Sequence, residues 1–197
     1  NFHEIKPNSL AINFIENKSN IFIKNLEIAS HVANDIFNDS NFPNLNGDLL
    51  INCLESFKMP PGRGEIFSLN KFKIIDDSYN ANPESVKAAL DHLSGYKEDR
   101  KFFVFGDMKE LGADEEIFHK KIGQYAVEKA DILLTVGKLA KNAQSNSNNF
   151  ALSLHFNDNF SLLEKLNELL TDGDIVLIKG SRSCLLYTSD AADDIRR

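Results

Sequence analysis

The chain has 197 residues, of which 42% are hydrophobic and 26% charged, a balance typical of a globular protein with one substantial core and an appendage. The net charge of -7, with no segment concentrated in Lys and Arg, argues against nucleic acid as a main partner. Cys53 and Cys184 lie far apart and outside CxxC spacing, which argues against a zinc site and a disulfide framework.

The sequence also lacks the signals that direct a chain into or across a membrane. No apolar run approaches the roughly 20 residues that a membrane helix needs. The first residues, NFHEIKPNSLAINF, lack the basic and then apolar order of a signal peptide. We therefore expect a cytoplasmic protein without membrane insertion. Because the chain does not start with Met, we expect it to begin within a longer protein.

The first sixty residues predict a hairpin and two helices. The hairpin would pair the short apolar runs Leu10–Ile15 and Ile21–Ile23 across a polar turn. Apolar residues then recur at helical spacing from Leu26 to Phe37, and Asn25 is placed to cap the first turn of that helix. A shorter helix is predicted over 49–57.

A boundary between two domains is predicted in the segment Lys58–Gly64. Its two prolines and two glycines cannot continue a helix and favour an extended link that can act as a hinge. The sequence thus divides into 1–60 and 61–183. Directly after the link, Glu65–Leu69 and Phe72–Asp76 are predicted to form a β-hairpin.

Strands and helices alternate over the rest of the chain. Asn82, Pro83 and Glu84 supply an N-cap, a proline at the first helical position and an acid near the positive helix end, so a helix is predicted from there to Leu93. Residues 142–149, rich in Ser and Asn, are predicted to be a solvent loop. The other predicted strands are Phe102–Phe105, Ile132–Val136, Leu152–Leu154 and Ile175–Ile178, and the other helices are Phe118–Ala126 and Phe160–Leu170.

This alternation predicts an α/β fold with a Rossmann-like, mainly parallel sheet and flanking helices. In such folds, ligands bind beyond the carboxyl ends of the strands. Polar residues gather at four predicted strand ends, which makes that edge the candidate site. These clusters are Asp76-Asp77-Ser78, Gly106-Asp107-Met108, Gly137-Lys138 and Lys179-Gly180-Ser181.

The segment Asp76–Pro83, DDSYNANP, admits two interpretations. Asp, Ser and Asn favour turns and helix caps for local reasons, so the whole segment can be structural. Alternatively, a carboxylate at this edge accepts hydrogen bonds from a ribose or an amine, while free helix N–H groups favour an anion. Spacing alone does not decide between them.

The strand-end segments resemble those of the Mur ligase family, specifically its MurF type. DDSYNANP after a proline-rich Gly-Arg link is similar to the segment that opens the family's C-terminal domain, and further matches follow in the right order over about 120 residues. These are VFGDMKELG (Val104–Gly112), His119 with Gly123, Val136-Gly137 and IKGSRS (Ile178–Ser183). The resemblance implies that 1–60 ends a central ATPase domain.

The resemblance implies three ATP-binding residues. Asn25 would open a helix facing the nucleotide phosphates, although a simple helix cap is an equal alternative. Arg63 would contact the phosphates with its guanidinium fork, against the alternative of a solvated charge. Asp77 would accept hydrogen bonds from the ribose, while Asp76 supports the turn.

The resemblance also implies a dipeptide pocket that closes over ATP. A zwitterionic dipeptide needs an acceptor for its ammonium and donors for its carboxylate, which Asp107 and Lys179 could supply. His119 is interpreted as a helix-surface residue or one that acts behind the site, rather than as a catalytic base. The pocket residues implied are Tyr79, Asn80, Asn82, Asp107, Lys179 and Ser181.

The activity implied is ATP-dependent ligation of D-alanyl-D-alanine to UDP-N-acetylmuramoyl-tripeptide through an acyl phosphate. The implied cofactors are ATP and Mg²⁺, and the expected state is a monomer. The GxxxxGK[ST] pattern is absent from this chain, as is the region that would hold the magnesium ligands, so the chain alone should not turn over.

The resemblance ends at Ser183. Residues 184–197 do not read like the amphipathic helix that the family has there, and we interpret them as translated adapter or vector sequence. The alternative is a divergent terminal helix. If the tail is foreign, the last helix is missing and one face of the sheet is exposed.

Two other functions remain open from the sequence. One is a ligase of the same superfamily that adds another amino acid, or glutamate to a folate, although DDSYNANP and GDMKELG argue against it. The other is a non-catalytic nucleotide- or peptide-binding module, which the missing P-loop favours. An upstream segment resembling TGTNGKT would identify the ligase.

Overall fold

The computed structural model of the chain describes residues 20–37, 56, 60–69, 72–98 and 100–181. Its internal contacts divide the chain into two units, Asn1–Met59 and Pro60–Arg197. The division falls inside the segment rich in Pro and Gly. The predicted strand Leu10–Ile15 and the tail 184–197 lie outside the described residues, and Ser56 is the one described residue of the helix predicted over 49–57.

In the first unit, the structure describes the helix α2, Asn20–Phe37. The predicted strand Ile21–Ile23 is therefore wrong, and Asn25 does not open the helix but lies in its second turn, exposed. The reason is that a three-residue strand must find a partner for its backbone, whereas a helix pairs its own N–H and C=O groups. The helix therefore begins five residues before the predicted cap residue, Asn25.

The second unit is built on a six-stranded sheet with the order β1-β2-β6-β3-β4-β5. β1 pairs antiparallel with β2, which confirms the hairpin, and all other pairs are parallel. This confirms the predicted α/β fold with a mainly parallel sheet. The strands are β1 Glu65–Leu69, β2 Phe72–Asp77, β3 Lys101–Gly106, β4 Ile132–Val136, β5 Leu152–Phe156 and β6 Ile175–Lys179.

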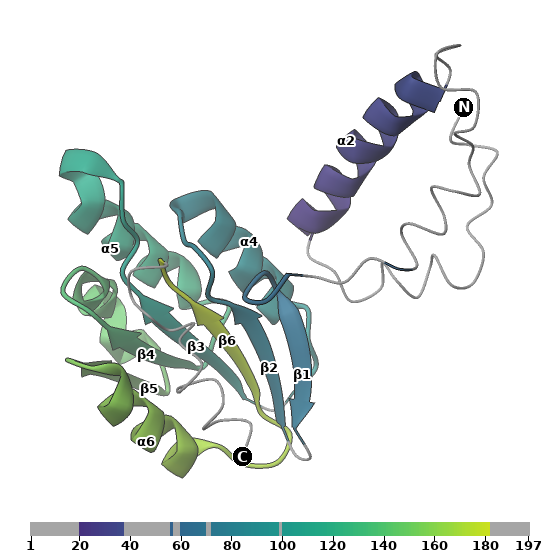
Figure 1. The fold of residues 1–197 in the computed structure, drawn as a ribbon. Helices are drawn as coiled ribbons and strands as arrows, with labels where there is room; N and C mark the ends of the chain where they lie inside the picture. The colour runs from purple at the N-terminus through teal and green to yellow at the C-terminus, as the bar shows by residue number, and fades with distance from the viewer. Residues whose placement is uncertain (1–19, 38–55, 57–59, 70–71, 99, 182–197) are drawn as a thin grey trace. The chain divides into compact units, whose positions relative to one another are not determined.

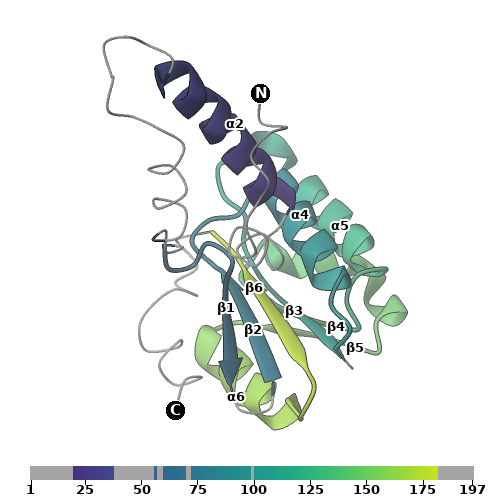
Figure 2. The ribbon, with the colours of Figure 1, turned by 90° about the vertical axis from the view of Figure 1, so that its right-hand side faces the viewer.

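Helices cover both faces of this sheet (Figures 1 and 2). On one face, α4 (Pro83–Ser94) and α5 (Glu115–Ala126) bury a core that includes Leu90, Phe103 and Phe105. On the other, α6 (Asn159–Leu169) packs on β4 and β5 over Phe102 and Val104. Successive residues of β3 thus point to opposite cores, which explains the continuous apolar runs.

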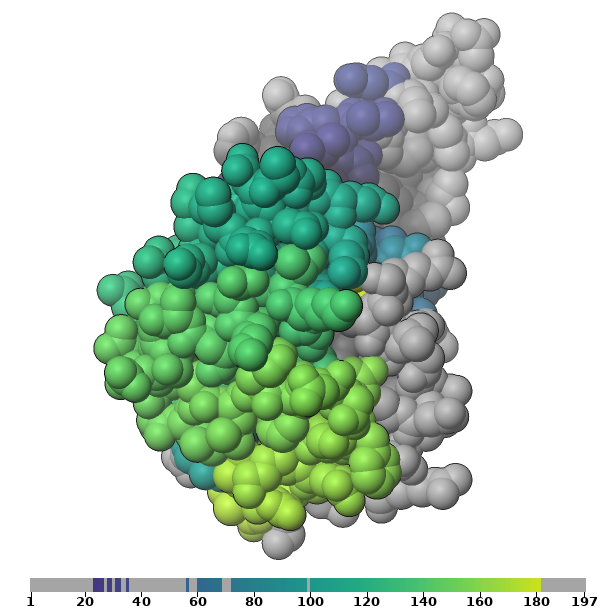
Figure 3. Space-filling model, turned by 90° about the vertical axis from the view of Figure 1, so that its left-hand side faces the viewer, coloured from purple at the N-terminus to yellow at the C-terminus, as the bar shows by residue number. Residues whose placement is uncertain are grey.

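The Ser/Asn-rich segment is not a solvent loop. It forms η3 (Ala140–Asn149), a 3₁₀ segment packed on α5, with Ala140 and Ala143 buried. Figure 3 shows this edge of the domain, with α5 above and α6 below. The contact with α5 is so close that only glycine fits at position 123. A Cβ there would lie 2.1 Å from the Ala143 carbonyl oxygen. Composition favoured a loop because the buried alanines are few among polar residues.

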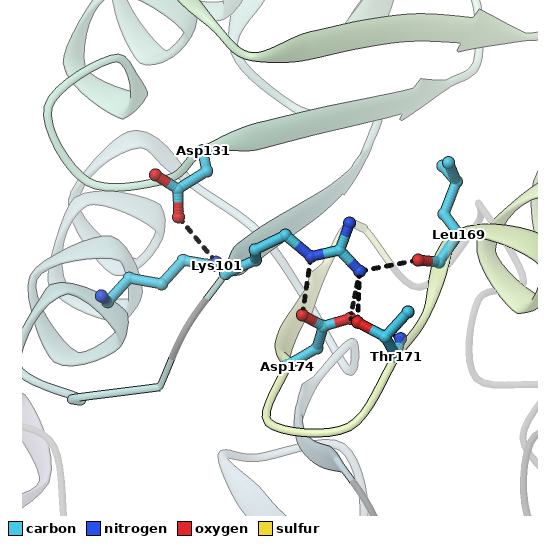
Figure 4. Close-up of polar contacts among 6 residues, drawn as sticks. Lys101, Asp131, Leu169, Thr171 and Asp174 are labelled. Atoms are coloured by element: carbon cyan, nitrogen blue, oxygen red, sulfur yellow. Dashed lines mark hydrogen bonds and ion pairs between the residues drawn. The ribbon is translucent and has the colours of Figure 1, made fainter.

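A polar network joins the amino ends of β3 and β6 (Figure 4). Asp174, fully buried, accepts hydrogen bonds from Arg100 Nε at 2.9 Å and Nη2 at 2.7 Å. Arg100 also donates to the Leu169 carbonyl oxygen at 2.8 Å, and Thr171 N donates to Asp174 at 2.6 Å. This network fastens the turn between α6 and β6 to the start of β3.

Candidate functional site

The carboxyl ends of β2, β6 and β3 bring the predicted strand-end residues to one edge of the sheet. In the parallel register, Asp77 lies beside Lys179, and Lys179 lies beside Phe105. Asp107 follows β3 directly, and Ser181 lies just beyond Gly180 at the end of β6. Ser181 N donates to the Asp107 carbonyl oxygen at 2.8 Å. Residues more than 100 positions apart in sequence therefore form one continuous edge.

Lys179 is the buried charge at the centre of this edge, with 1% of its surface exposed. Its Nζ donates to the Asp77 carbonyl oxygen at 3.2 Å and to the Asn80 carbonyl oxygen, and lies 3.2 Å from Asp77 Oδ2. An ammonium has three N–H groups, and the three acceptors match them. Burial lowers the pKa of Lys179 and raises the pKa of Asp77, while their mutual attraction opposes both shifts.

The turn after β2 is held by side chains within it. Asp76 Oδ1 accepts hydrogen bonds from Ser78 N at 3.2 Å and Ser78 Oγ at 2.5 Å, so Asp76 supports the turn as expected. Asn82 caps α4 by accepting from Ser85 N at 2.8 Å, and Ser85 Oγ accepts from Asn82 N at 3.1 Å. This capping box confirms the predicted helix start.

The link and the turn after β2 are fastened to each other. Tyr79 N donates to the Gly62 carbonyl oxygen at 2.9 Å, and Gly64 N donates to the Asp76 carbonyl oxygen at 2.7 Å. The Arg63 guanidinium lies 4.0 Å from the centre of the Tyr79 ring, a cation–π contact. The Arg63 side chain is thus exposed, but its guanidinium lies over the Tyr79 ring. A charge surrounded only by solvent would lack this contact.

Asp107 is buried, with 6% of its surface exposed. Its Oδ1 accepts hydrogen bonds from Leu139 N at 2.9 Å and Ala140 N at 2.8 Å, and its Oδ2 lies 3.2 Å from Lys109 Nζ. The carboxylate therefore faces the loop after β4. Sequence reasoning missed these partners, because the amides that meet Asp107 belong to residues whose side chains carry no signal.

His119 is fully buried in α5, so its interpretation as a helix-surface residue is wrong. Met108 N donates to His119 Nε2 at 2.8 Å, which makes Nε2 an acceptor and leaves Nδ1–H to donate to the Glu115 carbonyl oxygen at 2.6 Å. Burial lowers the pKa of His119, in keeping with a neutral ring. The side chain supports the loop after β3 from behind.

The predicted site residues thus separate into three groups. Asp77, Lys179, Asp107 and Ser181 form the buried or half-buried part of the edge, and Arg63, Tyr79, Asn80 and Asn82 lie along the link and the turn after β2. Asn25 belongs to the other unit. Among the described residues, no group of three or more His, Cys, Asp or Glu could hold a metal ion, and no described helix has the length and apolar character to cross a membrane.

Polar side chains at the carboxyl ends of a mainly parallel sheet are typical of α/β proteins that bind ligands there. Residues 62–182 match the family described as Mur ligase, glutamate ligase domain, and the chain belongs to the Mur ligase family. The resemblance seen in the strand-end segments is thereby confirmed.

Three individual proteins illustrate the similarity within this family. The UDP-N-acetylmuramoyl-tripeptide--D-alanyl-D-alanine ligase of Bacillus subtilis is 40% identical over 121 residues, 57% of this chain and 26% of the relative. A MurF structure from Acinetobacter baumannii is 27% identical with a TM-score of 0.69, over 77% of this chain and 34% of that one. MurF from Thermotoga maritima in complex with ADP is 28% identical with a TM-score of 0.61, over 70% and 31%. The chain spans about a third or less of the length of each of these three relatives.

Proposed function

We propose that this chain is the C-terminal part of an ATP-dependent ligase that joins D-alanyl-D-alanine to UDP-N-acetylmuramoyl-tripeptide in peptidoglycan precursor synthesis. The observation that carries the proposal is the edge where Lys179 joins Asp77 to the Asn80 carbonyl oxygen, within a chain that is 40% identical over 121 residues to a ligase of that name. In this assignment, 1–60 ends the central ATP-binding domain, 61–183 is the dipeptide-binding domain and 184–197 is a non-native tail.

Three residues are assigned to ATP. The half-buried Asp77 carboxylate accepts hydrogen bonds from the ribose, and Arg63, oriented by the Tyr79 ring, pairs with phosphate oxygens. Asn25 contributes its exposed side chain from the second turn of α2, not as a cap. The ADP bound by the Thermotoga maritima relative supports the nucleotide assignment.

The dipeptide site is assigned to Tyr79, Asn80, Asn82, Asp107, Lys179 and Ser181. Asn80 and Asn82 are exposed and carry both donors and acceptors, which suits a zwitterion with an ammonium and a carboxylate. Lys179, Asp107 and Ser181 are buried at the same ends of the strands.

The reaction proposed for the intact ligase has two steps. The terminal phosphoryl group of ATP passes to the tripeptide carboxylate, giving ADP and an acyl phosphate. The dipeptide amine then attacks the acyl carbon, the C–N bond forms, phosphate leaves and the amine loses a proton. Such chemistry depends on positioning and charge neutralisation, which are what a fixed strand-end edge supplies.

Other parts of the ligase have to complete the site. The GxxxxGK[ST] pattern is absent from this sequence, and we assign the phosphate-binding loop and the Mg²⁺ ligands to sequence outside this chain. The expected partners are the two substrates, without nucleic acid, and the expected state is a cytoplasmic monomer.

The test is an ADP-release assay on the intact reading frame. We expect release that requires both UDP-N-acetylmuramoyl-tripeptide and D-alanyl-D-alanine, and none above the no-enzyme control with the 197-residue chain alone. L-alanyl-L-alanine serves as the matched control substrate. Release that is independent of the dipeptide, or an intact protein that binds ATP without releasing ADP, would refute the ligase and favour a binding module.

A further inference from the structure

Asp107 connects two loops through its side chain. Its Oδ1 accepts the N–H groups of Leu139 and Ala140, the residues that lead from β4 into η3. Hydrogen bonds from backbone amides to a carboxylate are shorter and stronger than those between neutral groups. The path of the chain after β4 therefore depends on an acceptor at this position.

The main chain of the same residue holds a third loop. The Asp107 carbonyl oxygen accepts the Ser181 N–H at 2.8 Å, just beyond the end of β6. The following residue is anchored as well, because Met108 N donates to the buried His119 ring. Asp107 thus links the loops after β3, β4 and β6. The loop after β3 is itself anchored to α5 through Met108 and His119.

Gly137 is shaped for this contact. Its φ of +109° lies in the region that favours glycine, and a Cβ there would lie 2.4 Å from Asp107 Oδ1. The loop after β4 can pack against the carboxylate because this position has no side chain. The Asp107 carboxylate is therefore engaged on both oxygens, Oδ1 by two backbone N–H groups and Oδ2 by Lys109.

We propose that Asp107 is a positioning residue of the dipeptide site, which sets the loops after β4 and β6 through hydrogen bonds and does not contact the substrate ammonium. The inference rests on the proposed function and replaces a direct role for the carboxylate by an indirect one. It requires an oxygen acceptor at Oδ1, and the negative charge only strengthens the two hydrogen bonds. Lys109, half exposed beside Oδ2, balances that charge.

The test compares Asp107→Asn, Asp107→Ala and Gly137→Ala in the intact ligase by steady-state kinetics. Asn keeps an oxygen for the two amides, so we expect its KM for D-alanyl-D-alanine to stay within about threefold of the parent enzyme. Ala removes the acceptor, and we expect that KM to rise roughly tenfold or more, with the KM for ATP changed less than about twofold. Gly137→Ala, which changes no charge, should raise the dipeptide KM in the same way.

The opposite pattern overturns the inference. If Asp107→Asn raises the dipeptide KM as much as Asp107→Ala, the negative charge itself binds substrate. If Asp107→Ala does not fold, Asp107→Asn decides, since a direct role of the charge predicts that this variant is impaired and the positioning role predicts that it is not. A parent enzyme without dipeptide-dependent ADP release would instead refute the proposed function, whatever the variants do.

Discussion

The two edges of the sheet each bury one member of an ion pair, but their surroundings differ. At the amino edge, the fully buried Asp174 and its partner Arg100 bond to Thr171 and the Leu169 carbonyl oxygen, all of which hold one turn (Figure 4). At the carboxyl edge, the buried Lys179 holds a turn as well, but that turn also presents exposed polar side chains.

A buried ion pair alone therefore does not identify a functional site. Both pairs satisfy their hydrogen bonds internally, and among the described residues no buried side-chain nitrogen or oxygen lacks a partner. The two edges differ in the exposed side chains that lie near the pair. Asn80, Asn82 and Arg63 are exposed at the carboxyl edge, where open α/β sheets bind ligands.

Replacing Lys179 should have the largest effect. Lys179→Met leaves the Asp77 carboxylate and two carbonyl oxygens without their donor, and breaking a buried pair in this way costs roughly 3–5 kcal/mol of unfolding free energy. Denaturant unfolding of the purified domain measures it. Lys165→Met, which breaks an exposed pair with Glu168, is the matched control and should cost less than about 1 kcal/mol. Equal losses in the two variants would contradict a central role for Lys179.

Removing the carboxylate at the other edge should lower stability without changing substrate binding. Asp174→Ala removes the acceptor for Arg100 and Thr171 N, and we expect a loss of about 2–3 kcal/mol, less than for Lys179→Met because Arg100 can turn to solvent. The KM for D-alanyl-D-alanine, measured well below the melting temperature, should not change. A raised KM would mean that the amino edge takes part in binding.

Two substitutions of Asn82 separate its capping role from its proposed binding role. Asn82→Ala should cost about 1 kcal/mol of stability because the cap of α4 is lost. Asn82→Ser keeps an oxygen that can cap, so stability should recover. If Asn82 also binds the dipeptide, calorimetry should detect weakened binding in both variants. Binding that recovers together with stability would leave Asn82 with a cap alone.

His119 should make stability depend on pH. Because burial lowers its pKa, the folded protein binds the proton more weakly than the unfolded chain does. The stability that neutral His119 gives the folded protein is fully present above the pKa of an unfolded His, about 6.5. It is lost as the pH falls from there toward the folded pKa. Between pH 7.5 and 5.5, the melting temperature should therefore fall more in the parent protein than in His119→Gln. An equal fall would show that this ring does not titrate on unfolding.

The strands of the sheet and the cap of α4 could be predicted from sequence because their signals are local. Each signal lies in residues that are adjacent in the sequence. This holds for the apolar runs of β3, β4 and β6 and for the Asn82 cap. The strand-end motifs, placed by their order along the chain, identified the family.

The partners of Asp107 and the burial of His119 could not be predicted because they depend on tertiary contacts. Asp107 meets main-chain amides that any residue would carry, and His119 meets the amide of Met108 eleven residues earlier. The start of α2 was misplaced for a local reason, since a short apolar run fits both a strand and a helix. Asn25 was consequently given a cap position that it does not occupy.

The assignment of the dipeptide to the turn after β2 is tested by the affinity of the intact ligase for D-alanyl-D-alanine before and after the substitution Asn80→Ala. Asn80 is exposed, and its contact with Lys179 is made by its carbonyl oxygen, which Ala retains. Calorimetry in the presence of a non-hydrolysable ATP analogue should find the Kd raised roughly five- to tenfold, with an unchanged melting temperature. An unchanged Kd would contradict the assignment of the dipeptide to the turn after β2.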